Sequence, residues 1–137
     1  MKTKILHIKF QSLEEFRTEG RNAIKTDKTS IQKEDELFFS SVVLFERFFT
    51  PQKYRLLALI RALQPNSIYQ LAQFADRDFA NVSRDCYALE AVGFINLTTY
   101  RDGDREIKKP ELIFDYNKIE VHIPESVHLD FRLAQIA

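Results

Sequence analysis

Glycine and cysteine are both scarce in this sequence, with three glycines and one cysteine among its 137 residues. No Gly-x-Gly-x-x-Gly or P-loop string occurs, which excludes the glycine-rich loops that commonly hold phosphate groups. The single cysteine, Cys86, cannot form a disulfide within the chain. Because Cys86 falls on the apolar face of a predicted helix, we expect it to act as a small, buried hydrophobic side chain.

Long apolar segments and a net charge are also missing. No uncharged apolar run is long enough for a transmembrane helix, so we expect none. The N-terminal segment MKTKILHIKF lacks the apolar centre and cleavage site of a signal peptide, so we expect a cytoplasmic protein without membrane contact. Twenty basic residues balance twenty acidic ones. A surface for nucleic acid would therefore be a local basic patch on a neutral molecule.

The residue patterns that enzymes and metal sites need are absent as well. His7, His122 and His128 are scattered along the sequence, without the spacing of metal ligands. No nucleophile elbow of the Gly-x-Ser-x-Gly type occurs. We therefore expect no metal site, no cofactor and no enzymatic activity.

Residues 50–95 carry the strongest pattern, which predicts three helices followed by a strand. Thr50 is a favourable N-cap, and Pro51 takes the first helical position, where its missing N–H costs nothing. Ser67 is expected to cap the second helix and Gly93 to end the third. Apolar residues recur at helical intervals and predict the buried positions: Tyr54, Leu57 and Ile60 with Leu56 and Leu63 beside them, then Ile68, Leu71 and Ala72, then Phe79, Val82, Cys86, Leu89 and Val92.

The second and third helices, joined by a tight turn, have the pattern of a helix-turn-helix motif. In that motif the longer helix, here residues 79–92, enters the major groove of DNA. Asn81 and Arg84 lie on its outer face, and we expect them to contact base edges, because Asn pairs with adenine and Arg with guanine. Arg77 and Ser83 flank them and suit phosphates. Helix-turn-helix cores also serve as protein adaptors, so that alternative stays open.

A β-hairpin is predicted directly after the third helix. Residues 94–100 predict a strand, residues 101–104 a turn, and residues 105–109 the start of the return strand. Four basic residues near the tip are expected to contact flanking phosphates or the minor groove: Arg101, Arg105, Lys108 and Lys109. The acidic residues among them favour the alternative of an ordinary solvated hairpin.

After the hairpin, residues 110–137 predict only short elements. Pro110 is predicted to interrupt the return strand. Residues 112–114 and 119–123 predict two further short strands. Residues 125–137 predict one helix, which is too short to be stable alone.

The chain before residue 50 predicts two strands and two helices. Residues 4–10 alternate as a strand does, and Ser12 begins a helix with Glu15 completing a capping box. Residues 36–39 predict a second strand, followed by a helix rich in aromatic side chains. Five phenylalanines gather here: Phe38, Phe39, Phe45, Phe48 and Phe49. We expect them to be covered by the N-terminal strand and helix, by a dimer or partner interface, or by both.

The segment SIYQLAQFADRDFANVSRDCYALEAVGFI resembles the core of the MarR/ArsR-like winged helix-turn-helix regulators, and it is closest to small predicted antitoxin-like DNA-binding proteins. The shared pattern is S-hydrophobic-x-x-L-A, then R-D-aromatic-x-N-V-x-R-D, then A-L-E-x-x-G-hydrophobic-I. The matching residues are Ser67, Leu71, Ala72, Arg77, Asp78, Phe79, Asn81, Val82, Arg84, Asp85, Ala88, Leu89, Glu90, Gly93 and Ile95. The likeness extends upstream to residues 49–51 and downstream to residues 121–124. Asp76 stands where the pattern usually has glycine and Ala80 where it often has Lys or Arg, so this helix face is less basic.

Pattern and resemblance together imply an α+β fold with a winged helix-turn-helix core of three helices and a β-hairpin wing. We expect a strand and helix extension at residues 1–49, a winged-helix DNA-binding domain at residues 50–124 and a C-terminal tail at residues 125–137. The implied function is sequence-specific binding of double-stranded DNA by a transcriptional regulator. The most specific form of this prediction is an autoregulating, antitoxin-like repressor with a toxin partner. A homodimer is expected, built from the N-terminal extension, the segment Phe45–Phe49 or the tail. The alternative is a winged-helix protein–protein interaction adaptor that does not bind DNA.

Overall fold

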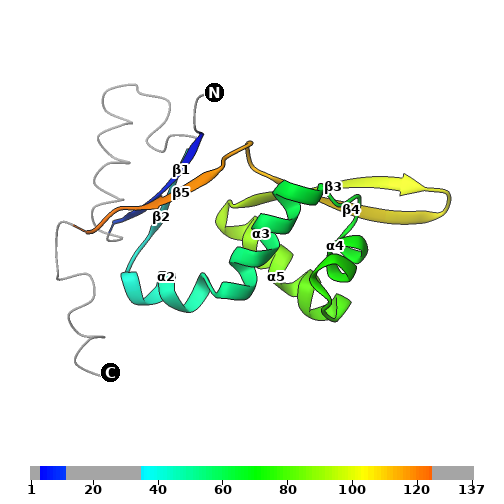
Figure 1. Ribbon diagram of the computed structural model, residues 1–137, viewed down its shortest axis with the longest axis horizontal. Helices are drawn as coiled ribbons and strands as arrows, with labels where there is room; N and C mark the ends of the chain where they lie inside the picture. Colours follow the sequence, from blue (N-terminus) through cyan, green and yellow to red (C-terminus); the bar gives the residue numbers. More distant parts are fainter. Residues whose placement is uncertain (1–3, 12–34, 125–137) are drawn as a thin grey trace, which may run out of the picture. The chain divides into compact units, whose positions relative to one another are not determined.

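The computed structural model describes residues 4–11 and 35–124, and these residues belong to two compact units. The first unit holds residues 4–11, 35–48 and 116–124, and the second holds residues 49–115 (Figure 1). Helices and strands both occur, so the predicted α+β class is confirmed. Within the described ranges, every helix is too short or too polar to span a lipid bilayer. The helices predicted from Ser12 and over residues 125–137 lie outside the described residues.

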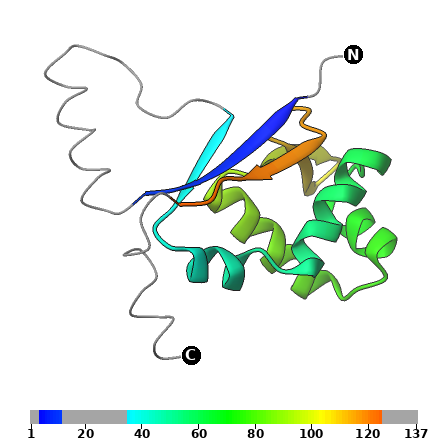
Figure 2. The same ribbon diagram turned by 60° about the vertical axis from the view of Figure 1, so that its left-hand side comes forward.

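A three-stranded parallel sheet forms the centre of the first unit. Strand β1 (Ile5–Phe10) lies between β2 (Glu36–Phe39) and β5 (Lys118–Val121) (Figure 2). The two strands predicted before residue 50 are thus confirmed. Successive side chains of a strand point to opposite faces, so Leu6 and Ile8 share one face of β1, and both are fully buried.

Helix α2 (Val42–Phe48) brings an aromatic cluster to the same unit. Ser41 begins the helix, because its Oγ accepts a hydrogen bond from a first-turn backbone N–H at 3.0 Å. The ring centroid of Phe45 lies 5.9 Å from that of Phe10 and 5.1 Å from that of Phe39, both edge to face. The strands of the unit therefore cover part of the phenylalanine-rich segment, as the first of the two alternatives expects.

Three helices form the body of the second unit. They are α3 (Pro51–Leu63), α4 (Ile68–Ala75) and α5 (Phe79–Val92). The predicted N-caps are confirmed, since Thr50 Oγ1 accepts a backbone hydrogen bond at 3.2 Å and Ser67 Oγ accepts one at 2.9 Å. Local sequence therefore sets where these two helices begin.

Each of these helices contributes one apolar stripe to the core. The buried residues are Leu56, Leu57 and Ile60 of α3, Ile68, Leu71, Ala72 and Ala75 of α4, and Val82, Cys86 and Leu89 of α5. Three residues predicted to be buried are instead exposed, Tyr54 by 56%, Leu63 by 51% and Phe79 by 49%, and Val92 is half-buried. Leu63 is the last residue of α3 and Phe79 the first of α5, where a helix has neighbours on fewer sides.

Strands β3 (Ile95–Asp102) and β4 (Arg105–Leu112) form the antiparallel hairpin of the second unit, with Gly103 in the turn at φ +66°. The prediction that Pro110 interrupts the return strand is wrong, because Pro110 is buried within β4 and lies opposite Leu97. Hydrogen-bonded and non-hydrogen-bonded pairs alternate along a hairpin. Counting from the pair that closes the turn, Pro110 falls at a non-hydrogen-bonded pair, so its missing N–H removes no bond to β3.

The segment after β4 differs from the prediction in two ways. Residues 113–117 lie outside helices and strands, so no separate strand forms at residues 112–114. The strand predicted at residues 119–123 is present as β5, but it pairs with β1 in the first unit. The structure thus divides the chain after residue 115, whereas the sequence placed all of residues 50–124 in one domain. Local patterns show that a segment forms a strand but do not identify its partner.

Gln64 and Asp76 end α3 and α4 in the left-handed backbone region, with φ of 46° and 53°. A residue with a Cβ is strained there, whereas glycine is not. We expect Gln64→Gly and Asp76→Gly each to raise the free energy of unfolding by up to about 1 kcal/mol in urea denaturation. The matched control is Gln73→Gly inside α4, which should lower it by about 1 kcal/mol. Equal losses for Gln64→Gly and Gln73→Gly would show that the helix ends are not left-handed.

Candidate nucleic-acid interface

The turn between α4 and α5 is held by hydrogen bonds at both of its ends. At the end of α4, the backbone N–H of Asp76 donates to the carbonyl oxygen of Gln73 at 3.1 Å. At the start of α5, the carboxylate of Asp78 accepts a hydrogen bond from the backbone N–H of Asn81 at 3.3 Å. These contacts fix the direction in which the first turn of α5 projects from α4.

The buried stripe of α5 determines which of its residues face outward. Val82, Cys86 and Leu89 are fully buried, so the opposite side of the helix is turned to solvent. Asn81 and Arg84, the two predicted base-contacting residues, are both exposed. Within the described residues, the Arg84 guanidinium forms no ion pair or hydrogen bond. No described residue therefore engages its five N–H donors.

Cys86 has the role that the sequence predicts for it. Its side chain lies on the inner side of α5 and is fully buried. Burial, with the negative charge of Asp85 as the second cause, raises the pKa of the Cys86 thiol to about 12. The thiol stays protonated at neutral pH, as befits a packing residue rather than a reactive one.

Arg77 is engaged within the second unit. Its Nη2 atom lies 2.8 Å from Asp85 Oδ2, and the two side chains are only 18% and 19% exposed. Its Nη1 atom is buried and has no hydrogen-bond partner among the described residues. The ion pair joins the α4–α5 turn to the body of α5. Arg77 therefore braces the turn through Nη2, and its contact with phosphates stays a prediction.

The predicted basic residues of the hairpin divide between its two faces. Lys108 and Lys109 are neighbours in β4, so they point to opposite sides. Lys108 Nζ lies over the ring of Tyr87 on α5, 4.8 Å from its centroid. A hydrogen bond with the Tyr87 side chain is the main cause that raises the pKa of Lys108, so this amine stays charged beside α5. Lys109 Nζ lies 3.4 Å from a glutamate carboxylate of its own strand.

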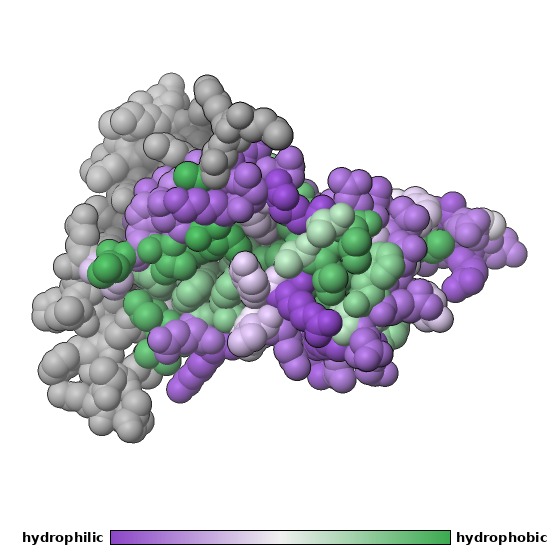
Figure 3. Space-filling view, in the orientation of Figure 1, coloured by the Kyte–Doolittle hydropathy of each residue, from purple (hydrophilic) through white to green (hydrophobic). Residues whose placement is uncertain are grey.

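Arg101 and Arg105 lie close to the turn of the hairpin. Both are exposed, and neither forms an ion pair with another described residue. The end of the hairpin is mainly hydrophilic on the face seen in Figure 3. No described residue therefore competes with phosphates for the two guanidinium groups.

An open groove of about 700 Å³ lies between α4, α5 and β4. Its aromatic and basic lining residues include Tyr69, Phe79, Tyr87, Arg105 and Lys108, with Ser83 between them. Ser83 is half-buried and faces this groove, beside the predicted base-contacting residues. The groove therefore joins the exposed side of α5 to the hairpin.

Three aromatic residues of the groove are not among the predicted site residues. Tyr69 is exposed by 62%, Phe79 by 49% and Tyr87 by 44%, and the rings of Tyr69 and Phe79 lie 6.4 Å apart. Phe79, Ser83 and Tyr87 follow one another at intervals of four, which places them in one row on a helix. That row was visible in the sequence, but the same spacing also fitted Phe79 into the buried stripe.

Comparison with known proteins identifies one family. Residues 48–121, more than half of the chain, match the model of the HVO_A0114 family. The matched region begins just before α3 and ends with β5, so it includes all elements of the interface. No curated protein and no solved structure matches the chain.

Proposed function

The chain belongs to the HVO_A0114 family, and from the interface described above we propose that it is a sequence-specific regulator that binds double-stranded DNA. In this proposal residues 49–115 act as a winged helix, with α3, α4 and α5 as the helical core and the β3–β4 hairpin as the wing. Helix α5 then enters the major groove. The observation that carries the proposal is the exposed Arg84 on α5, which pairs with no described residue and lies in the same unit as the exposed Arg101 and Arg105 of the hairpin.

The base-reading role falls to the outer face of α5. Arg84 presents a guanidinium fork that fits the O6 and N7 acceptors of guanine, and the amide of Asn81 fits adenine. The hydrogen bonds at the α4–α5 turn and the brace between Arg77 and Asp85 hold this face in one orientation. A fixed orientation favours base reading, because a bidentate contact requires both donors to arrive together.

The phosphate-binding role falls to the hairpin. Lys108 is held over Tyr87, which places a permanent charge next to the reading helix. Arg101 and Arg105 extend this charge toward the turn, where a wing meets the adjacent backbone or minor groove. Lys109 has a smaller part in the proposal, because it points to the other face and is paired within β4.

We include homodimerisation in the proposal, because helix-turn-helix proteins read two-fold operators with paired helices. If its operator lies upstream of its own gene, the protein is an autoregulating repressor. An antitoxin-like repressor would also bind a toxin protein as its partner. Winged-helix protein adaptor remains the second candidate. Its support is the groove beside α5, where Tyr69, Phe79 and Tyr87 offer exposed aromatic surface of the kind that protein interfaces use.

A salt series separates the two candidates. A dimer that neutralises about six phosphates should lose roughly a thousandfold in duplex affinity between 50 and 200 mM salt, because each contact releases bound counterions. Fluorescence anisotropy with a labelled duplex measures this slope, and titration at high concentration gives the number of chains bound per duplex. An adaptor gives no duplex binding even at the lowest salt.

A further inference from the structure

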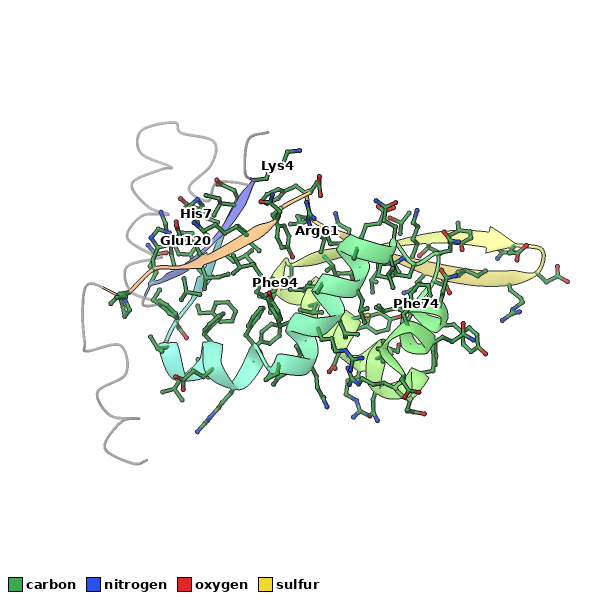
Figure 4. All side chains as sticks on the ribbon, in the orientation of Figure 1. Lys4, His7, Arg61, Phe74, Phe94 and Glu120 are labelled. Atoms are coloured by element: carbon green, nitrogen blue, oxygen red, sulfur yellow. The ribbon has the colours of Figure 1, made fainter. Side chains whose placement is uncertain are left out.

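Two histidines and a glutamate meet on one face of the sheet in the first unit. His7 lies directly opposite Glu120 in the pairing of β1 with β5, and Figure 4 shows their side chains together. His122 comes two residues after Glu120, which places it on the same face. The fold therefore brings together two histidines that are far apart in the sequence. Their nitrogens are 2.8 Å apart although 115 positions separate them in the sequence.

The ligand atoms of these three residues converge. His7 Nδ1 lies 2.8 Å from His122 Nε2 and 3.2 Å from Glu120 Oε2. His122 Nε2 lies 3.5 Å from the same Oε2 atom. A triangle with these edges has points about 2 Å from all three corners, which is the length of zinc–nitrogen and zinc–oxygen bonds. The edges are also close to the ligand–ligand separations of a tetrahedral site with bonds of that length.

We propose that His7, Glu120 and His122 bind a divalent transition-metal ion, with Zn²⁺ as the preferred ion. Two imidazoles favour zinc and its transition-metal neighbours over Mg²⁺ and Ca²⁺, which prefer oxygen ligands. The side chains are 24%, 40% and 40% exposed, so an ion can enter from solvent. Three protein ligands leave the fourth position of a tetrahedral ion to water or to an incoming ligand.

Nearby carboxylates are arranged to support this site without crowding it. Asp35 Oδ2 lies 3.9 Å from His7 Nε2, the nitrogen that does not face the other ligands. This distance is too long for a hydrogen bond, but the negative charge favours the tautomer with the proton on Nε2, which leaves Nδ1 free to bind metal. Glu36 is committed elsewhere, because its Oε1 accepts a hydrogen bond from Lys9 at 2.8 Å. Lys118 Nζ lies 3.5 Å from Glu120 Oε1, so the pairing uses the oxygen that does not face the histidines.

The test uses the full, untagged chain, stripped with a chelator and titrated with Zn²⁺ in a calorimeter and with Co²⁺ in a spectrophotometer. We expect one ion per chain and visible Co²⁺ absorption typical of four-coordinate binding. His7→Ala, His122→Ala and Glu120→Gln should each lower the affinity by roughly a hundredfold or more. Asp35→Asn should lower it by less, because this carboxylate lies 3.9 Å from His7, beyond hydrogen-bond distance. The matched control Glu106→Gln makes the same change at an exposed glutamate of β4 and should leave the affinity unchanged.

Circular dichroism checks independently that each variant is folded. Zn²⁺ should also raise the unfolding temperature of the unmodified chain, and a chelator should reverse this rise. The proposal would be overturned if the unmodified chain bound no ion at about 100 μM. This concentration is far above the dissociation constants of structural zinc sites. In that case the three residues form only a hydrogen-bonded pair of imidazoles beside a carboxylate. Unchanged affinity in the well-folded Glu120→Gln variant, or an equal loss in Glu106→Gln, would also overturn it.

Discussion

Leu89→Ala is expected to lower the free energy of unfolding by about 2–5 kcal/mol, a large part of the 5–15 kcal/mol typical of a domain. Leu89 is fully buried, on the inner stripe of α5 with Val82 and Cys86. Truncation removes apolar contacts and leaves a cavity that close-packed neighbours fill only in part. Urea denaturation followed by circular dichroism measures the change.

Leu63→Ala is the matched control for this prediction, since it makes the same change at another helical leucine. Leu63 is 51% exposed at the end of α3, so its truncation should change the free energy of unfolding by less than about 1 kcal/mol. The sequence pattern predicted burial for both leucines. Similar losses for the two variants would contradict the core assigned here to α3 and α5.

Arg84→Ala is expected to reduce the preference for specific over random DNA by roughly 5- to 150-fold, the equivalent of about 1–3 kcal/mol. In the proposed complex, removing the guanidinium abolishes a bidentate base contact that random DNA does not offer. Arg84→Lys should lose most of the same preference, because an ammonium keeps the charge but lacks the planar fork. Competition between labelled specific duplex and unlabelled random duplex measures the ratio directly.

Lys108→Ala and Lys109→Ala complete this comparison. Lys108→Ala should weaken binding to both duplexes alike, because phosphates are present in every sequence. It should also reduce the slope of log affinity against log salt concentration by about one, the value of one phosphate contact. Lys109→Ala should have a smaller effect, since Lys109 points to the opposite face and is paired within β4. If Arg84→Ala weakens specific and random duplexes equally, α5 is not the reading helix.

Features that depend on neighbouring residues could be predicted from the sequence. Thr50 and Ser67 cap their helices because a hydroxyl accepts a hydrogen bond from an N–H three residues ahead. Gly93 ends α5 with φ of 110°, a conformation that favours glycine. The resemblance pattern also expected glycine near position 76, and Asp76 does adopt a left-handed conformation there. Such signals lie within a few positions along the chain.

Features that depend on distant partners could not be predicted in the same way. The pairing of β5 with β1 brings His122 beside His7, and nothing local to either residue indicates it. The pairing of Arg77 with Asp85 is not predictable from the sequence either, because it depends on how the α4–α5 turn folds. The exposure of Phe79 is likewise not predictable from periodicity, because periodicity does not indicate that the ends of helices are less covered.

The most direct test of DNA reading is one ratio of dissociation constants for the unmodified chain. The two duplexes are the DNA upstream of its own gene and a shuffled duplex of the same composition, compared at about 150 mM salt, the ionic strength at which long-range electrostatics are screened. We predict that the upstream duplex binds at least roughly a thousandfold more tightly, as specific regulators do. Equal affinity for the two duplexes, or no binding to either, would contradict the proposal that this chain regulates its own gene by reading that DNA.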